Sequence, residues 1–225
     1  MSPHRNSATP IPARVSPRLA AVASLVPEAS RVADVGCDHG ELARELLRSA
    51  RASFVVASDV VRTARAAGGE VDWRVGDGLS PLTPGDRLDV VVLAGMGAAT
   101  LLRILDRRRL DELGVRRLVV QPQTEPHRVR ATMLERGFAV VDEAAAEDAG
   151  RFYAAIAFER GFGLPAFGGL EPGDTLAAGP VLLARRDPAA RRHWERQRRR
   201  LAGLPARAPD LARAERLVSF FARGG

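Results

Sequence analysis

Short apolar runs alternate with amphipathic segments along most of the chain. Runs typical of strands cover residues 32–35, 54–57, 71–75, 88–94, 118–121, 138–142 and 152–158. Segments with apolar residues at helical spacing cover 40–50, 98–105 and 125–136. The run 88–94 is almost continuously apolar, as expected of a central strand that is buried on both faces.

This alternation of strands and helices predicts an α/β fold with a doubly wound parallel sheet. The last two runs are joined without a helix, through the acidic turn Glu147-Asp148-Ala-Gly150, so we expect them to add an antiparallel pair at one edge. In such sheets, ligands bind beyond the carboxyl ends of the strands.

The pattern changes after Gly161. Residues 161–179 are rich in Gly and Pro and are interpreted as a linker, followed by a very basic helix at 188–201 and a second helix at 210–222. Two helices joined by a short Pro-containing link form a helical hairpin. We therefore expect three parts. They are a flexible N-terminal arm (1–16), the main α/β domain (17–160), and a linker with a hairpin (161–225).

Composition narrows the class of protein. With 225 residues, 46% of them hydrophobic, the chain can bury a sizeable core. It has no apolar run of the roughly 18–20 residues that cross a bilayer, and residues 1–17 have no apolar core like that of a secretory signal. The single cysteine, Cys37, excludes an internal disulfide and a cysteine-cluster metal site. We expect a cytoplasmic protein without metal or membrane contact, a monomer or weak dimer.

All 34 basic residues are arginines, and the formal net charge is +7. GC-rich coding is one explanation for the arginines. A polyanionic partner is the other, because guanidinium groups bind phosphate in a bidentate manner.

Four loop clusters follow four predicted strands, at the expected ligand-binding edge. They are Asp34-Val-Gly36-Cys37-Asp38-His39, Asp59, Gly76-Asp77-Gly78 and Ala94-Gly95-Met96-Gly97. An acid that closes the second strand is placed to accept hydrogen bonds from ribose, and an Asp after the third strand could meet the amino group of adenine. The glycines leave bare backbone facing a flat base.

Charge distinguishes between the possible nucleotide ligands. NAD or FAD would place pyrophosphate at the first turn, where the loop Gly36-Cys-Asp-His-Gly40-Glu of this chain has an acid instead. S-adenosylmethionine (SAM) has no phosphate and carries a sulfonium and an ammonium group, which carboxylates attract. The clusters therefore favour SAM.

The same motifs resemble those of the TrmK family. The matching segments are Arg18-Leu-Ala-Ala-Val-Ala-Ser-Leu-Val-Pro27, Ala33-Asp-Val-Gly-Cys-Asp-His39, Gly76-Asp-Gly-Leu79, Leu93-Ala-Gly-Met-Gly97, Gln121-Pro122 and Glu147-Asp-Ala-Gly-Arg-Phe-Tyr153. The resemblance implies a Rossmann-like SAM-dependent methyltransferase domain with a C-terminal helical hairpin. It also implies methylation of N1 of adenine 22 in the D-loop of tRNA. On this pattern the cofactor side comprises Asp34, Gly36, Cys37, Asp38, His39, Asp59, Asp77, Gly78, Gly95 and Met96.

Each candidate role has a structural alternative. Asp38 is the first candidate for the catalytic carboxylate, or else it caps the following helix. His39 contacts RNA or orients a carboxylate, or is structural. Met96 lines the ligand or belongs to the core. Gln121 hydrogen-bonds the flipped base, or only satisfies a turn. The candidates for a phosphate grip, or else for a solvated charged face, are Arg191, Arg192, Arg196 and Arg199.

One departure from the family pattern leaves further alternatives open. Only 17 residues separate Asp59 from Asp77, so 62–69 has room for about two helical turns and the adenine side of the pocket is less enclosed. The alternatives to a tRNA methyltransferase are a SAM-dependent enzyme with another acceptor and a catalytically eroded SAM- or RNA-binding homologue.

Overall fold

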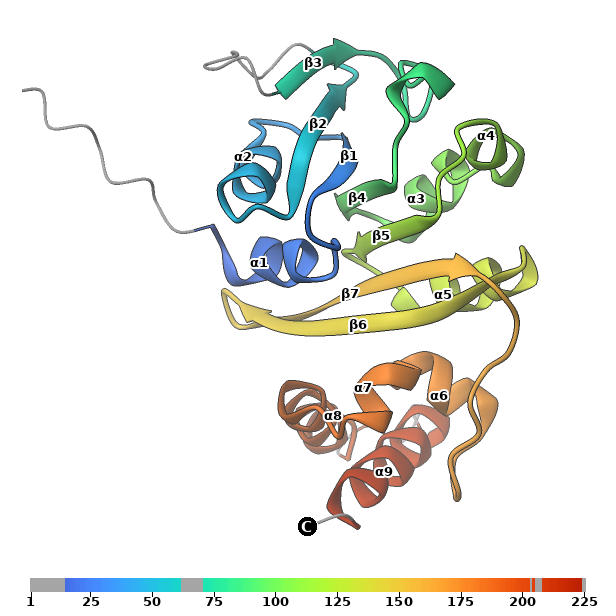
Figure 1. Ribbon diagram of the computed structural model, residues 1–225. Coiled ribbons are helices and arrows are strands. Elements are labelled where there is room, and N and C mark those ends of the chain that lie inside the picture. Colours follow the sequence, from blue (N-terminus) through green and yellow to red (C-terminus); the bar gives the residue numbers. More distant parts are fainter. Residues whose placement is uncertain (1–14, 62–70, 203, 205–207, 224–225) are drawn as a thin grey trace, which may run out of the picture.

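The computed structural model describes residues 15–61, 71–202, 204 and 208–223. In this part of the chain, seven strands form one sheet in the order β3-β2-β1-β4-β5-β7-β6 (Figure 1). The strands are β1 (Ser30–Val35), β2 (Ala52–Asp59), β3 (Val71–Val75), β4 (Val90–Met96), β5 (Arg117–Pro122), β6 (Phe138–Asp148) and β7 (Arg151–Arg160). Strands β1 to β5 are parallel, whereas β7 runs antiparallel to both β5 and β6. The predicted parallel sheet with an antiparallel edge pair is confirmed.

Helices cover both faces of the sheet. Helices α1 (Pro17–Ser24) and α2 (Glu41–Arg48) pack on one face, and α3 (Ala98–Ile104), α4 (Arg107–Glu112) and α5 (Pro126–Glu135) on the other. Alternation along β1 explains the two cores, because Val32 faces the first helix layer while Ala33 and Val35 face the second. The middle of β4 is buried on both faces, which accounts for its continuous apolar run.

Helix α1 was not predicted from the hydrophobic pattern. It begins at Pro17, and the Ser16 side chain accepts a hydrogen bond from the backbone N–H of Leu19 at 3.3 Å. Pro is tolerated in the first turn of a helix because its missing N–H would have no partner there. Residues 1–14 of the predicted arm and the predicted short helix at 62–69 lie outside the described residues.

The predicted linker at 161–179 is wrong in its second half. Residues Pro172–Ala178 form helix α6, which is followed by α7 (Pro180–Ala184). The buried Asp174 carboxylate accepts a hydrogen bond from the backbone N–H of Glu171 and two from the Arg216 guanidinium, at 2.7 and 2.9 Å. A contact 42 residues away therefore stabilises a helix that local composition does not favour.

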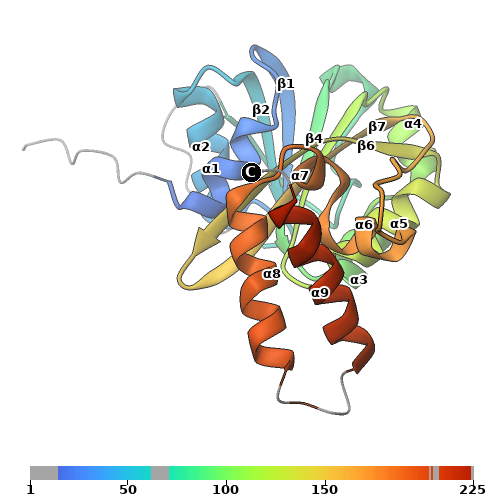
Figure 2. The same ribbon diagram turned by 90° about the horizontal axis from the view of Figure 1, so that it is seen from below.

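The C-terminal helices α8 (Pro188–Leu201) and α9 (Ala208–Ala222) lie side by side and confirm the predicted helical hairpin. Leu217 and Phe221 of α9 pack with Leu183 of α7 and Ala154 of β7 in a third core. Figure 2 shows that the hairpin extends past the sheet at the end where α3 begins. Since α3 follows β4 directly, this is the end at which the parallel strands have their carboxyl termini.

A buried ion pair joins the C-terminal helices to the sheet. Arg130 of α5 and Glu143 of β6 are 1% and 0% exposed, and Arg130 Nε donates to Glu143 Oε1 at 2.7 Å. Arg130 also donates to the Leu176 carbonyl of α6, and Glu143 Oε2 accepts from the backbone N–H of Val181 in α7. A side chain at Gly179 would overlap both charged groups, so the chain must pass this point as glycine.

Candidate functional site

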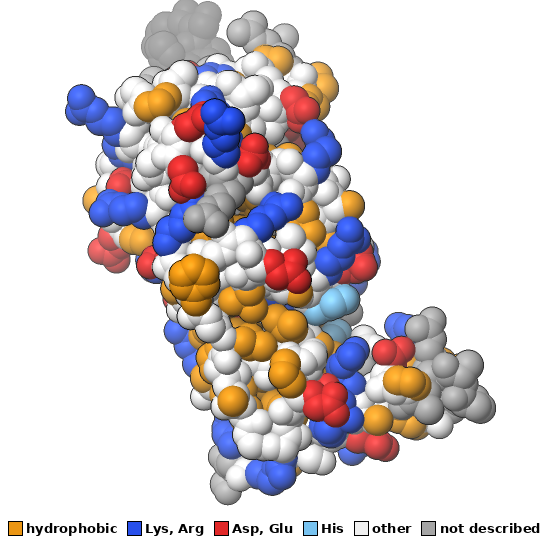
Figure 3. Space-filling view, turned by 90° about the vertical axis from the view of Figure 1, so that its right-hand side faces the viewer, with side chains coloured by type: hydrophobic (Ala, Val, Ile, Leu, Met, Phe, Trp, Pro, Cys, Tyr) orange, Lys and Arg blue, Asp and Glu red, His pale blue; other side chains and the backbone are white. Residues whose placement is uncertain are grey.

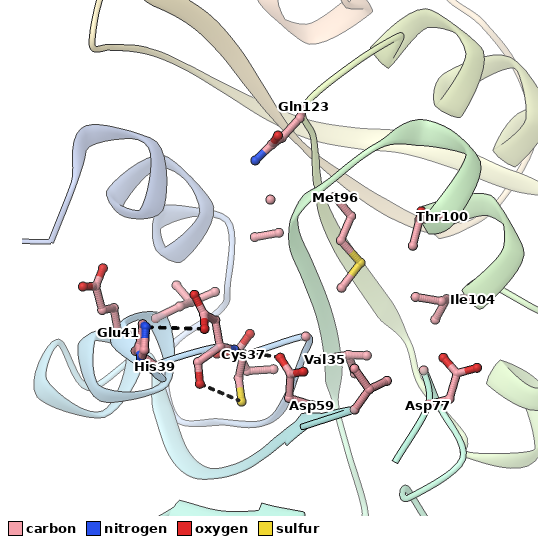
Figure 4. Close-up of a pocket in the computed structure, with 18 of the residues that line it drawn as sticks. Val35, Cys37, His39, Glu41, Asp59, Asp77, Met96, Thr100, Ile104 and Gln123 are labelled. Carbon is pink, nitrogen blue, oxygen red and sulfur yellow. Dashed lines mark hydrogen bonds and ion pairs between the residues drawn. The ribbon is translucent and has the colours of Figure 1, made fainter. Parts of the chain in front are cut away.

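The four predicted loop clusters meet at one cavity of about 530 Å³ beyond the carboxyl ends of the parallel strands (Figure 4). This size lies in the range of about 300–1,000 Å³ that is usual for small-ligand sites. Every candidate cofactor residue lines the cavity, and so do Asp38 and His39. Residues that the sequence reasoning did not select also line it, among them Arg18, Glu41, Thr100, Arg103 and Gln123.

The first loop is held close to the end of β2. The backbone N–H groups of Gly36 and Cys37 donate to the Ser58 carbonyl at 2.7 and 3.1 Å, and the Asp38 N–H donates to Asp59 Oδ2 at 3.0 Å. Gly36 has φ of +75°, and a Cβ there would overlap the Met96 methyl group. Glycine is therefore needed both for the turn and for the close approach of Met96.

Asp34 is the most unusual group in the cavity. Its residue is 2% exposed, and its Oδ2 atom has no hydrogen-bond partner among the described residues. Burial raises the pKa of this carboxyl to about 7, a backbone hydrogen bond involving Ala43 opposes the shift, and the charge of Asp59 adds to it. A buried carboxyl with one unpaired oxygen, at the wall of a cavity, is suited to a cationic ligand group.

The second and third acids lie further along the same rim. Asp59 Oδ1 accepts from the backbone N–H of Val61 at 3.3 Å, while its other oxygen holds the first loop. Asp77 pairs with Arg103 of α3 at 3.2 Å, and both side chains are 63% exposed. Screening by water makes this exposed pair weak, so the Asp77 carboxylate can exchange Arg103 for a ligand donor.

The geometry around the start of α2 decides between the two candidate roles of Asp38. The position that caps α2 is occupied by Gly40 at φ +70° and has no side-chain hydrogen bond, so Asp38 is not a helix cap. Asp38 and His39 are exposed at the cavity, with Asp38 Oδ1 and His39 Nε2 3.6 Å apart. Burial and the nearby carboxylates raise the pKa of the Cys37 thiol to about 12, which keeps it protonated and unreactive.

Gln121 lies in a different environment from the one expected of a base-reading residue. It is completely buried and absent from the cavity wall. Its Oε1 accepts hydrogen bonds from Arg18 Nη1 at 2.8 Å and from the Gly95 N–H at 3.2 Å, and its Nε2 donates to the Pro122 carbonyl. The strand-end position was a correct signal for the site, but local sequence could not show which of Gln121 and Gln123 faces the cavity.

The four candidate phosphate-binding arginines are all exposed on α8. Arg191 pairs with Glu195, and both Arg192 and Arg196 pair with Glu147 of β6. Arg199 forms no ion pair within the described part of the chain. His193, on the same helix, stacks on Phe152 with the two ring centres 4.3 Å apart. Burial lowers the pKa of His193 to about 4, so this side chain adds no charge near neutral pH.

The described residues form no group of three or more His, Cys, Asp or Glu side chains arranged to hold a metal ion. None of their helices is both long and apolar enough to cross a membrane.

The sheet order, the acidic rim and the cavity define a Rossmann-like methyltransferase, and the chain belongs to the methyltransferase domain family, whose model matches residues 15–156. Comparison with individual proteins is more specific. The chain is 26% identical over 194 residues to the tRNA (adenine(22)-N(1))-methyltransferase of Bacillus subtilis, covering 82% of this chain and 81% of the relative. These comparisons confirm the predicted TrmK family.

Two solved structures agree with this assignment. A candidate tRNA (m1A22) methyltransferase from Streptococcus pneumoniae, in complex with S-adenosyl-L-methionine, is 27% identical with a TM-score of 0.79, covering 92% of this chain and 99% of that one. The B. subtilis tRNA methyltransferase TrmK has the same fold, with a TM-score of 0.71 at 22% identity, covering 93% and 98% of the two chains.

Proposed function

We propose that this protein transfers the methyl group of SAM to N1 of adenine 22 in the D-loop of tRNA. The observation that carries the proposal is the buried Asp34 carboxyl, whose Oδ2 atom has no partner among the described residues, in a cavity whose rim also bears Asp38, Asp59 and Asp77. With Glu41, five carboxyl groups line this cavity, which favours a cationic ligand and disfavours a pyrophosphate. The likeness to tRNA methyltransferases and the basic hairpin at the same end of the sheet support the acceptor.

The cavity residues fit SAM at both ends. Asp34 would accept the ammonium group, which would supply the partner that its Oδ2 atom lacks. Asp59 would accept the ribose hydroxyls, Asp77 with Gly78 would face the adenine, and the backbone at Gly36, Cys37, Gly95 and Met96 would line the middle. When bound, SAM supplies a methyl group that is already activated by a sulfonium leaving group.

The protein's own contribution to the reaction is positioning and charge. The adenine N1 lone pair forms the new C–N bond as the C–S bond breaks, and the product base carries the positive charge. Asp38, exposed at the cavity and 3.6 Å from His39 Nε2, stabilises that charge or accepts a proton from N6. His39 orients the Asp38 carboxylate. Oriented reactants account for much of the rate of such a transfer.

Replacing Asp38 by Asn should lower kcat by about a hundredfold or more, because the variant keeps the shape but loses the charge. Asn tolerates the left-handed backbone at this position, where φ is +47°. Single-turnover methylation and calorimetric SAM binding should be measured together. An unchanged kcat would remove Asp38 from the reaction, whereas loss of SAM binding in step with kcat would assign it to the cofactor site.

The α8–α9 hairpin is suited to bind the phosphate backbone of the tRNA. Figure 3 shows the hairpin projecting at lower right, separated by a notch from the body of the molecule. Because the hairpin projects at the end of the sheet that bears the cavity, RNA bound along it would present an unstacked base to the site. A tRNA-modifying enzyme of this kind works in the cytoplasm.

Replacing Arg191 and Arg199 together by Gln should raise the KM for tRNA roughly tenfold. It should also reduce the steepness with which the logarithm of the tRNA association constant falls with the logarithm of salt concentration, by about one to two. The kcat at saturating tRNA should change little. Arg116→Gln is the matched control, since Arg116 is 80% exposed but lies at the amino end of β5, away from the cavity. An equal effect of both substitutions would show non-specific charge attraction and contradict a grip by α8.

The decisive test of the proposed function is methylation of an unmodified tRNA transcript with SAM, followed by nucleoside mass spectrometry. We expect 1-methyladenosine in the D-loop, and none when adenine 22 is replaced by another base. Methylation of a small molecule or protein instead would favour another acceptor. Absence of any SAM binding would favour an eroded homologue.

A further inference from the structure

Gln123 carries a side-chain amide at the part of the cavity that lies across Met96 from Asp59 and Asp77. It follows β5, and its backbone N–H donates to the Met96 carbonyl at 2.8 Å, which ties this loop to the end of β4. The exposed side chain lines the cavity, and its amide has no hydrogen bond to any other described residue. Figure 4 shows it extending into the cavity across Met96 from Asp59 and Asp77.

The neighbouring polar groups cannot take the same role. Both ends of the Gln121 amide are hydrogen-bonded, to Arg18, Gly95 and Pro122, and the residue is buried away from the cavity. The Arg18 guanidinium is in turn held by Gln121, and its Cζ lies 6.0 Å from the ring centre of Tyr153. Gln121 and Arg18 therefore form a fixed support beside Gln123, whose donor and acceptor are both available.

We propose that Gln123 selects adenine by pairing with its N6 and N7 atoms. The inference rests on the proposed function. Methyl transfer to N1 requires a free Watson–Crick edge, so recognition must come from another edge of the base. A glutamine amide forms a bidentate pair with adenine, accepting from N6 and donating to N7. Guanine presents acceptors at both O6 and N7, so the amide oxygen would meet another acceptor, and guanine would be rejected.

The test combines Gln123→Ala with a tRNA that carries 7-deazaadenine at position 22. For the wild type, removing the N7 acceptor should lower kcat/KM by about tenfold or more. Gln123→Ala should lose a similar factor on adenine and lose little further on 7-deazaadenine, because both changes remove the same hydrogen bond. Glu135→Ala, at the opposite end of α5, is the control and should behave as the wild type.

If the kcat/KM losses caused by Gln123→Ala and by 7-deazaadenine multiplied, the two changes would act independently, and this result would overturn the proposal. Equal kcat/KM values of the wild type on adenine and on 7-deazaadenine would overturn it too. A second variant, Gln123→Glu, keeps the size but places a carboxylate oxygen against N7. It should methylate 7-deazaadenine better than adenine, and the reverse preference would also overturn the proposal. Failure of the proposed function is distinguishable, because the wild type would then methylate no unmodified tRNA at adenine 22 at all.

Discussion

Replacing Asp34 by Asn is expected to weaken SAM binding by about a hundredfold and to stabilise the ligand-free protein at pH 8. The first effect follows because Asn cannot neutralise an ammonium group in a site that excludes water. The second follows because burial holds the folded-state pKa near 7, well above the ordinary value of 3.8 for aspartate. At pH 8 the wild type is therefore destabilised by the ionisation of this buried carboxyl, whereas the Asn variant has no group to ionise there.

The stability of the wild type should depend on pH through Asp34. Between about pH 4 and pH 7 the folded protein holds a proton at Asp34 that the unfolded chain has released, so the stability of the wild type falls as pH rises. The gap between variant and wild type should open over this window and reach about 2 kcal/mol or more above it. Denaturant unfolding at pH 5 and pH 8 measures it.

The same titration should appear in cofactor binding. Since the ammonium group requires an ionised Asp34, the Kd of the wild type for SAM should fall about tenfold between pH 6 and pH 8, with proton release below pH 7. Asp86→Asn is the contrasting variant, because Arg74 lowers the pKa of Asp86 to about 2 and its loss should destabilise the protein. A Kd for SAM that is independent of pH and unchanged in Asp34→Asn would remove Asp34 from the site.

Replacing Glu143 by Ala should lower the free energy of unfolding by about 3–5 kcal/mol. The change would leave Arg130, which is 1% exposed, without a counter-charge in the interior. It would also leave the backbone N–H groups of Val181 and Leu182 without their acceptor, so the junction between β6, α6 and α7 would loosen. Thermal unfolding should shift down by roughly 10 °C.

Two further variants separate the buried pair from general loss of charge. Glu112→Ala breaks exposed pairs with Arg108 and Arg109 on α4 and should cost under about 1 kcal/mol. The double variant Arg130→Met with Glu143→Leu removes both buried charges and should recover much of the stability lost by Glu143→Ala. A loss in the double variant equal to the sum of the single losses would show that the two side chains act independently.

The hydrophobic pattern by itself determined the parallel sheet, its antiparallel edge and the C-terminal hairpin. It could do so because burial on one or both faces of a strand requires apolar residues at a regular spacing in the sequence. The same spacing predicted where each strand ends, and therefore that the acidic loops lie at the carboxyl-terminal edge of the sheet. It did not reveal α1 or α6, whose ends are fixed by Pro, by capping side chains and by the distant Arg216.

Only the tertiary structure decided which polar groups face the cavity and what state they are in. Gln121 and Gln123 are two residues apart and chemically identical, yet one is sealed beneath Arg18 and the other is open to the ligand. Asp34 differs from an ordinary aspartate only through the atoms packed around it. Side-chain burial, hydrogen-bond partners and local charge arise from residues brought together across the chain, so no local pattern of residues could specify them.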